Sequence, residues 1–327
     1  MNMVPKISVV MAIYNAAAQI DGALNSLVAQ EFGDWELIVV DDASTDGAGA
    51  LIGQRAVHDP RIFYQRLPCN VGPAAARNVG LDAARGEWVT VLDGDDRYDS
   101  GRLRILLDRA NRDQLDLIAD NLMLFDEAAG ETLGPAFALN GESYPLTVRR
   151  LVENDRPPRI TVLGQLKPFV RRAFLLATGV RYPEDVRVGE DFQFLFHLLE
   201  HTPRALLVDY CGYRYTLPFS PSAGRQAAGT RTSHGSDGLS DLIKGAACLI
   251  DHASKQANVD RHLLKSLRKR QKALRGEALW RRARVHVHAS KFLAAAWLLA
   301  RIDPGYCWEQ AMGMFKGRKR RVQSMLR

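Results

Sequence analysis

Short apolar runs alternate with segments of helical periodicity over the first 92 residues, and this alternation constrains the fold more than any other feature. The apolar runs are rich in β-branched residues and cover residues 7–12, 35–40, 62–65 and 88–92. Helical patterns separate them at residues 20–28, 48–57 and 73–84. Connections of this length require successive strands to run parallel, with helices on both faces of the sheet. The sequence therefore predicts an α/β fold with a mostly parallel central sheet.

Acidic residues follow two of these expected strands. Asp41 and Asp42 come after the second strand, and Asp93, Asp95 and Asp96 come after the fourth. Because ligands of parallel sheets bind at the carboxyl ends of the strands, both clusters should line one crevice. Turn and helix-capping chemistry also explains the first cluster. The three acids of the second cluster repel one another, so this site calls for a hard divalent cation such as Mg²⁺ or Mn²⁺.

A helix start lies between the two clusters. Gly72 allows a tight turn, Pro73 fits the first helical turn, and Arg77 stands one turn further along. Arg77 could pair with the acidic strand end or with a phosphate, and the spacing does not separate these two roles. The glycine patterns of a dinucleotide fingerprint and of a P-loop are both absent from the sequence.

A second acidic pair, Glu190 and Asp191, opens an apolar helical segment. Acids in the first turn of a helix complement its macrodipole, which is one explanation for the pair. A carboxylate in this position is also well placed to accept a proton from a substrate hydroxyl.

Taken in order, these segments resemble family 2 glycosyltransferases of the GT-A fold, the fold of nucleotide-diphospho-sugar transferases. The resemblance rests on ISVVMAIYN (7–15), LIVVDDASTD (37–46), NVGPAAARN (70–78), LDGDD (92–96) and Glu190-Asp191. Within the family, the pattern is similar to bacterial enzymes that build exopolysaccharides such as succinoglycan. Phe192, Phe194 and Phe196 stand where the family often carries a Trp-rich acceptor motif, so the acceptor is not indicated.

This resemblance implies an inverting, metal-dependent transfer of a sugar from a nucleotide-diphosphate donor, with UDP as the expected nucleotide and Mg²⁺ or Mn²⁺ as the metal. The acceptor would be a hydroxyl of a glycan or a lipid-linked oligosaccharide in exopolysaccharide or cell-surface polysaccharide synthesis. By resemblance, the nucleotide contacts fall on Ala12, Tyr14, Asp42, Arg77 and Asp93, the metal ligand is Asp95, and the catalytic base is Asp191, with Glu190 as second candidate. Asp96 is a neighbour of these residues to which the resemblance assigns no separate role.

The charge of the chain is unevenly distributed. The net charge is +7, yet residues 261–327 hold 18 Lys or Arg against three acids, so residues 1–260 are net negative. A basic region favours an anionic partner such as a membrane surface or nucleic acid, although a solvated helix face explains it equally well. Its longest apolar run, residues 292–300, falls short of the roughly 20 residues that span a bilayer.

Three regions are expected. Residues 1–215 form the GT-A catalytic domain, with a nucleotide-binding half to about residue 97 and an acceptor half from about residue 98. Residues 216–238, rich in Ser, Gly and Pro, form a flexible loop. Residues 239–327 form a basic helical C-terminal extension, with helical patterns at 239–256, 259–275 and 277–301, which either lies on a membrane interface or packs on the catalytic domain.

The four cysteines are far apart, and the N-terminus lacks the pattern of a signal peptide, which indicates a reduced cytoplasmic protein. The basic region would add peripheral contact with the inner face of the cytoplasmic membrane. Two other classes of function stay open. A nucleotidyltransferase could share the acidic strand ends, and a nucleic-acid-binding protein could use residues 316–321, although no aromatic platform or zinc-ligand spacing supports base recognition.

Overall fold

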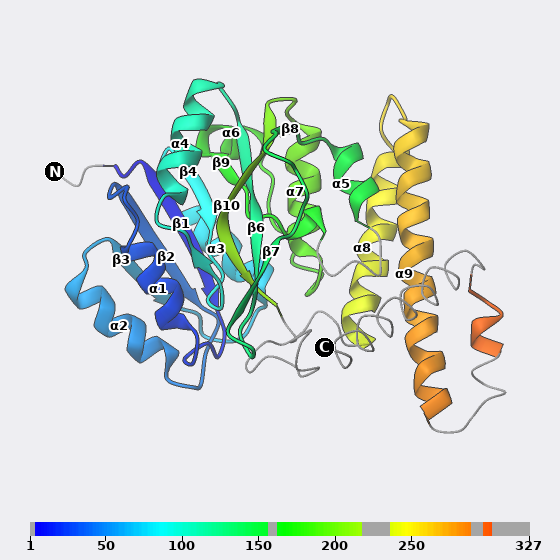
Figure 1. The fold of residues 1–327 in the computed structure, drawn as a ribbon, viewed down its shortest axis with the longest axis horizontal. Coiled ribbons are helices and arrows are strands. Elements are labelled where there is room, and N and C mark those ends of the chain that lie inside the picture. Colours follow the sequence, from blue (N-terminus) through cyan, green and yellow to red (C-terminus); the bar gives the residue numbers. More distant parts are fainter. Residues whose placement is uncertain (1–3, 156–161, 218–235, 289–296, 303–327) are drawn as a thin grey trace, which may run out of the picture. The chain divides into compact units, whose positions relative to one another are not determined.

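The computed structural model describes residues 4–155, 162–217, 236–288 and 297–302, whose strands form a ten-stranded sheet (Figure 1). The strands are β1 (Ile7–Ile13), β2 (Trp35–Asp41), β3 (Ile62–Arg66), β4 (Trp88–Val91), β5 (Arg97–Tyr98), β6 (Leu117–Asp126), β7 (Glu131–Pro135), β8 (Tyr144–Pro145), β9 (Phe169–Arg171) and β10 (Ala205–Thr216). The helices are α1 (Ile20–Val28), α2 (Ala48–His58), α3 (Pro73–Ala83), α4 (Arg102–Arg112), α5 (Val148–Asn154), α6 (Arg172–Thr178), α7 (Glu190–Glu200), α8 (Ser236–Ser254) and α9 (Arg261–His288), with a 3₁₀ turn η1 (Leu163–Gln165).

The sheet runs in the order β3-β2-β1-β4-β9-β6-β10-β5, with β7 paired to β6 and β8 to β10. β1 is parallel to β2 and β4, β2 is parallel to β3, and β10 is parallel to β6. Between these two groups lies the short strand β9, antiparallel to both β4 and β6. Helices flank the sheet (Figure 1). The predicted GT-A architecture, with a mostly parallel central sheet flanked by helices, is confirmed.

Burial explains the strong sequence signal of the first strands. Every residue of β2 is buried, and so is every residue of β1 except Ala12. α3 packs against both strands, and Gly80 of this helix lies directly over Val10 of β1. A helix can approach a strand this closely only where it carries no side chain at the contact. The first residue of α3 is Pro73, as the sequence predicts.

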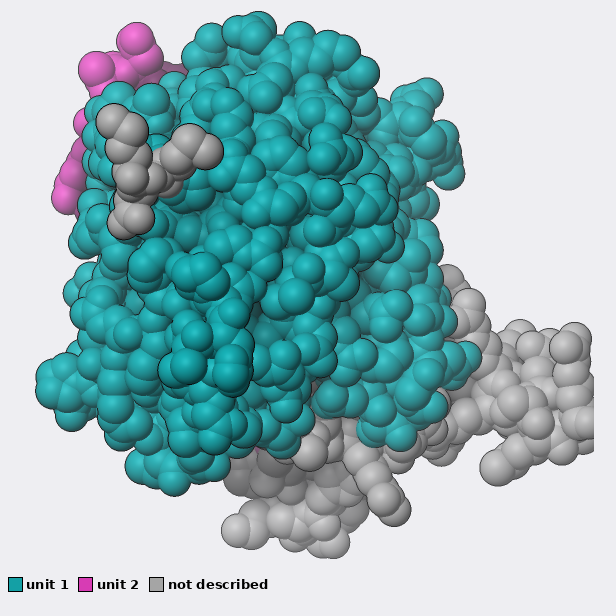
Figure 2. Space-filling model, turned by 90° about the vertical axis from the view of Figure 1, so that its left-hand side faces the viewer, with its two compact units in different colours: residues 1–151, 163–232 teal, residues 152–162, 233–327 magenta. Residues whose placement is uncertain are grey.

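The chain divides into two compact units, coloured separately in Figure 2. The first comprises residues 1–151 and 163–232, and the second comprises residues 152–162 and 233–327. The expected boundaries at residues 215 and 238 stay predictions, and most of the expected loop, residues 218–235, lies outside the described residues.

In the second unit, α8 and α9 pack together through Leu239, Ala246 and Leu274. α9 passes through Gly276 without a break, whereas the sequence analysis divided this stretch into two helical segments. Gly276 is buried, so packing maintains the helix across a residue of low helix propensity. None of the helices in the described part of the chain is both long and apolar enough to cross a membrane.

Candidate active site

The carboxyl ends of β1, β2 and β4 meet at one edge of the sheet. Asp42 donates its backbone N–H to the carbonyl of Ile13 at 2.8 Å, and Leu92 donates to the carbonyl of Val10 at 3.0 Å. The ladder therefore continues just past the strands, and the chain then turns into the two acidic clusters. Parallel pairing is what brings clusters separated by about fifty positions in the sequence to the same edge.

The carboxylates of the first cluster, Asp41 and Asp42, accept hydrogen bonds mainly from neighbouring parts of the chain. Asp41 is fully buried and accepts hydrogen bonds from the Tyr64 hydroxyl at 2.7 Å and the Ser44 amide at 2.8 Å. Asp42 accepts the backbone N–H groups of Val71 and Gly72 at 2.7 and 2.9 Å. Asp42 thereby fixes the turn that precedes α3. Its contact with a nucleotide base stays a prediction.

The loops that follow β1 and β2 are tied together. The backbone N–H of Asn15 donates to the Ser44 hydroxyl at 3.0 Å. The side-chain Oδ1 of Asn15 accepts a hydrogen bond from the backbone N–H of Thr45 at 2.8 Å. Asn15 and Ala43 both adopt positive φ, at 52° and 62°, which costs free energy for residues other than glycine and is often found at functional sites. Beside them, Ala12 and Tyr14 are half-buried at the end of β1. Their predicted contact with the nucleotide is not tested by this geometry.

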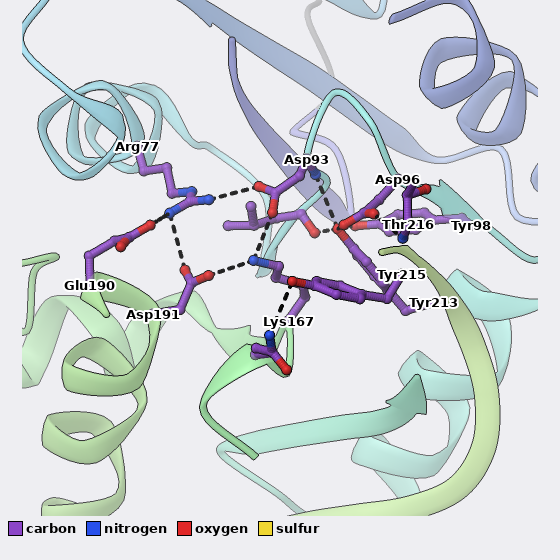
Figure 3. Close-up of polar contacts among 12 residues, drawn as sticks. Arg77, Asp93, Asp96, Tyr98, Lys167, Glu190, Asp191, Tyr213, Tyr215 and Thr216 are labelled. Carbon is purple, nitrogen blue, oxygen red and sulfur yellow. Dashed lines mark hydrogen bonds and ion pairs between the residues drawn. The ribbon is translucent and has the colours of Figure 1, made fainter. Parts of the chain in front are cut away.

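Arg77 joins the two halves of the first unit (Figure 3). Its guanidinium lies 2.8 Å from Asp93 Oδ1, 2.7 Å from Glu190 Oε1 and 3.1 Å from Asp191 Oδ1. Of the two roles that the sequence left open for Arg77, pairing with acids is the one observed. The acids come from the end of β4 and from the first turn of α7, so one side chain of α3 connects elements far apart in sequence.

Lys167 is the second cation of this network, and the sequence analysis did not identify it. Its ammonium lies 2.8 Å from Asp93 Oδ2 and 2.6 Å from Asp191 Oδ2, and its side chain is only 3% exposed. Asp93 and Asp191 are thus each bound by the same two cations, one on each carboxylate oxygen (Figure 3).

Lys167 is positioned by packing and by a buried ion pair. η1, three residues upstream, packs against α7, where Gly164 leaves room for the ring of Phe192. The Lys167 carbonyl accepts a hydrogen bond from Arg102 at 2.9 Å, and Arg102 pairs with Asp120 at 2.8 Å, with both side chains at most 1% exposed. A fully buried ion pair is costly unless its geometry is satisfied, so this arrangement rigidly supports the chain that carries Lys167.

Asp95 and Asp96 differ in their surroundings. Asp96 is buried and accepts hydrogen bonds from the Tyr213 hydroxyl and the Thr216 amide, both at 2.7 Å. Asp95 is half-buried, and its carboxylate pairs with no cationic side chain among the described residues. Its backbone carbonyl accepts a hydrogen bond from the Thr216 hydroxyl at 2.6 Å. Of the three clustered acids, Asp95 therefore has the carboxylate that the protein leaves available for a ligand.

The pKa values of these acids separate accordingly. Burial would raise the pKa of Asp93, but the charges of Lys167 and Arg77 outweigh it and hold that pKa well below its usual range. Burial, with repulsion from Asp93, raises the pKa of Asp95 to about 6. Burial also raises the pKa of Asp96 well above its ordinary value, and burial beside Asp191 raises that of Glu190. Both cations are held in their charged forms, because Asp191 and Asp93 raise the pKa values of Arg77 and Lys167 despite burial.

One signal in the sequence could have revealed Lys167. Arg77 is the single cation among the motif residues, yet three acids, Asp93, Glu190 and Asp191, converge on it. Three half-buried carboxylates in contact require more positive charge than one arginine supplies. Lys167 stands in an apolar stretch before β9, which makes it the natural second cation.

The chain was compared with proteins of known family and structure. Residues 8–157 match the family model for glycosyl transferase family 2. Succinoglycan biosynthesis protein ExoO of Rhizobium meliloti (strain 1021) is 34% identical over 227 residues, which cover 65% of this chain and 61% of the relative. The chain therefore spans less than two thirds of the length of this relative.

Two solved structures share the fold. S. aureus TarS 1–349 in complex with UDP-GlcNAc superposes with a TM-score of 0.66 at 18% identity, over 90% of each chain. Mannosyltransferase PcManGT from Pyrobaculum calidifontis, in complex with GDP-Man and Mn²⁺, has a TM-score of 0.55 at 19% identity, over 96% of this chain and 80% of that one. At such identities the likeness concerns the fold alone. The family match over residues 8–157 and the shared fold agree with the ordered acidic motifs, so this part of the chain is similar to glycosyl transferase family 2.

Proposed function

We propose that this protein transfers a sugar, with inversion, from a UDP-linked donor to a hydroxyl of a glycan or lipid-linked oligosaccharide in exopolysaccharide or cell-surface polysaccharide synthesis. One observation carries the proposal: Asp93, assigned to the donor, and Asp191, assigned to the acceptor, are bound by the same two cations. The match of residues 8–157 to the family 2 model and the similarity to ExoO, a succinoglycan biosynthesis protein, support it.

Asp191 is the proposed catalytic base. Its carboxylate would accept the proton of the acceptor hydroxyl, and the oxygen would attack the anomeric carbon from the face opposite the leaving diphosphate. A single displacement of this kind needs one base and no covalent intermediate. Arg77 and Lys167 bind different oxygens of Asp191, at 3.1 and 2.6 Å, and so fix the plane of its carboxylate. Glu190, bound to Arg77 at 2.7 Å, is the second candidate.

The donor would lie along the strand ends, near Ala12, Tyr14, Asp42 and Asp93. Arg77 offers a further donor group, because its Nε is buried and has no hydrogen-bond partner within the described part of the structure. A buried donor without a partner is costly, and an oxygen of the bound diphosphate would satisfy it.

The acids after β4 fit a divalent cation. Asp95 has a carboxylate without a cationic partner among the described residues, and burial beside Asp93 raises its pKa to about 6. Oxygen ligands of this kind suit Mg²⁺ or Mn²⁺, so Asp95 is the proposed ligand. When bound, the ion would stabilise the negative charge that develops on the leaving diphosphate.

The cellular location follows from the proposed acceptor. A lipid-linked oligosaccharide is held in a membrane, and we place the enzyme in the cytoplasm, peripherally at the inner face of the cytoplasmic membrane. The basic region that begins at Arg261 supports this placement through its attraction to anionic lipid.

Release of nucleoside diphosphate tests the proposal. The protein is incubated with UDP-sugars and with other nucleotide sugars in the presence of Mn²⁺ or Mg²⁺, and we expect UDP release that depends on acceptor and metal. Asp191→Asn should lower kcat by about 10²- to 10⁴-fold, because it removes the base, while nucleotide binding is retained. Asp95→Asn should instead weaken nucleotide binding in the presence of metal.

A matched control is Asp113→Asn. Asp113 is the C-cap residue of α4, and its carboxylate pairs with Arg109 and Arg112 of that helix. This variant should transfer like the wild type. Unchanged transfer by both Asp95→Asn and Asp191→Asn would refute the site assignment. Release of pyrophosphate or nucleoside monophosphate would identify a nucleotidyltransferase instead.

A further inference from the structure

One face of α9 is covered with exposed cations. At about 3.6 residues per turn, these side chains fall within an arc of about 140° and extend over about 31 Å of helix. The cationic face of α9 consists of Arg261, Lys265, Arg268, Lys269, Lys272, Arg275 and Arg282, each of them exposed.

The acid content of α9 does not balance this face. The helix contains a single acid, Glu277, which is buried and bound to Arg281 at 2.6 Å. Arg270 lies on another side of the helix and pairs with Asp155, and His262, at the edge of the cationic face, has its Nδ1 3.7 Å from Glu153 Oε1. None of these residues belongs to the cationic face, whose seven side chains are exposed to solvent.

The opposite side of α9 is committed to packing within its own unit. Leu264, Leu267 and Leu274 are buried, and Leu274 belongs to the cluster shared with α8. α9 is therefore amphipathic. Its apolar side is buried within the second unit, and its polar side is positively charged. Such a face is suited to a flat anionic surface more than to a groove.

We propose that the cationic face of α9 binds the anionic phospholipid surface of a bilayer. The choice of lipid rests on the proposed function, in which the acceptor is held in a membrane. Trp297 supports it: this side chain is 61% exposed, and its neighbour Leu298 packs on Ala283 near the C-terminal end of the cationic face. Tryptophan is enriched at membrane–water interfaces. The cationic face itself carries no aromatic residue on which nucleic-acid bases could stack.

Co-sedimentation of the full chain with vesicles tests the proposal, without donor or acceptor present. We expect binding to vesicles of phosphatidylglycerol mixed with phosphatidylcholine, little binding to phosphatidylcholine alone, and loss of binding as salt is raised. The triple variant Lys265→Gln, Arg268→Gln, Lys269→Gln should lower partitioning onto anionic vesicles by about 100-fold, at about fivefold for each cation removed. Glutamine preserves helix propensity, and circular dichroism checks the fold.

A charge-matched control removes three exposed cations from other elements, with Arg104→Gln, Arg112→Gln and Lys255→Gln. It should bind anionic vesicles nearly as well as the wild type. Equal loss in both triple variants would overturn the proposal, since net charge and not the α9 face would then govern binding. So would failure of the wild type to prefer anionic vesicles, or tighter binding to a DNA duplex at the same ionic strength.

This outcome is independent of catalysis. Vesicle binding by a protein that transfers no sugar would sustain the α9 proposal and refute the proposed enzyme. Sugar transfer to a water-soluble acceptor, without any vesicle binding, would sustain the proposed enzyme and overturn the α9 proposal.

Discussion

At the scale of single residues, the site depends on two carboxylates that share two cations. Asp93 and Asp191 would repel each other if Arg77 and Lys167 did not lie between them. The sequence identified Asp93, Asp191 and Arg77 because each stands at the end of a strand or in the first turns of a helix. It did not identify Lys167, because the burial of this lysine depends on tertiary packing, and the excess of acids among the motif residues was the one indication of a second cation.

Lys167→Met is expected to reduce kcat/KM by about 100-fold or more, because the carboxylate of Asp191, the proposed base, loses one of the two groups that orient it. Loss of the ammonium also lets the pKa of Asp93 return toward its ordinary value, so the acid limb of the pH profile should shift to higher pH. Initial rates measured across the pH range check both effects.

Lys255→Met, on an exposed lysine of the loop after α8, is the comparison and should leave the profile unchanged. A Lys167→Met protein that loses activity with an unshifted acid limb, at unchanged thermal stability, would contradict the electrostatic role of this lysine.

Asp95→Asn is expected to stabilise the free protein at neutral pH. The folded pKa of about 6 lies above the ordinary value of 3.8, so folding binds a proton between these values and the stability of the wild type falls as pH rises from about 4 to about 6. Above pH 6 this cost is complete and amounts to at most about 3 kcal/mol. The variant avoids it, because an amide does not ionise.

Chemical denaturation of the wild type and Asp95→Asn at pH 4 and pH 8 measures this difference. The advantage of the variant should be present at pH 8 and small at pH 4. An advantage of equal size at both pH values would show that ionisation of Asp95 is not its cause. A stability cost at a proposed ligand site agrees with the usual exchange between function and stability.

At the scale of elements, the contact of α3 with β1 determines where Arg77 stands. A Cβ on Gly80 would collide with the Val10 side chain, so this glycine sets the distance between helix and strand. Gly80→Ala is therefore expected to destabilise the protein by about 1 to 3 kcal/mol, although alanine is the better helix former. Transfer activity should fall as well, because displacement of α3 moves Arg77 away from Asp191.

Gly53→Ala provides the matched control. Gly53 lies inside α2, and a Cβ there would meet nothing within 4 Å. Only the difference in helix propensity then applies, and the free energy of unfolding of this variant should rise by up to about 1 kcal/mol. Thermal unfolding of both variants gives the comparison, and two gains of equal sign would show that the contact with Val10 can relax.

At the scale of the whole molecule, the two halves of the first compact unit differ in how far the sequence predicts them. β1 to β4 and α1 to α3 follow the expected periodicity closely, because regular crossovers and the burial of β1, β2 and β4 on both faces produce strong patterns. In the second half, β5 and β8 have two residues each and β9 has three. Strands this short carry no measurable period, and the antiparallel insertion of β9 between β4 and β6 depends on long-range pairing.

The burial of Lys167 has a practical consequence for anyone who attaches this protein to a support. Reagents that acylate amines require an accessible, neutral amine, and Lys167 is 3% exposed and bound to two carboxylates. They will react first with exposed lysines such as Lys255, Lys265 and Lys269. Coupling through amines would leave the network around Asp191 chemically intact, while it neutralises part of the cationic face of α9. A single labelling reaction would therefore alter the surface that we assign to lipid without altering the proposed active site.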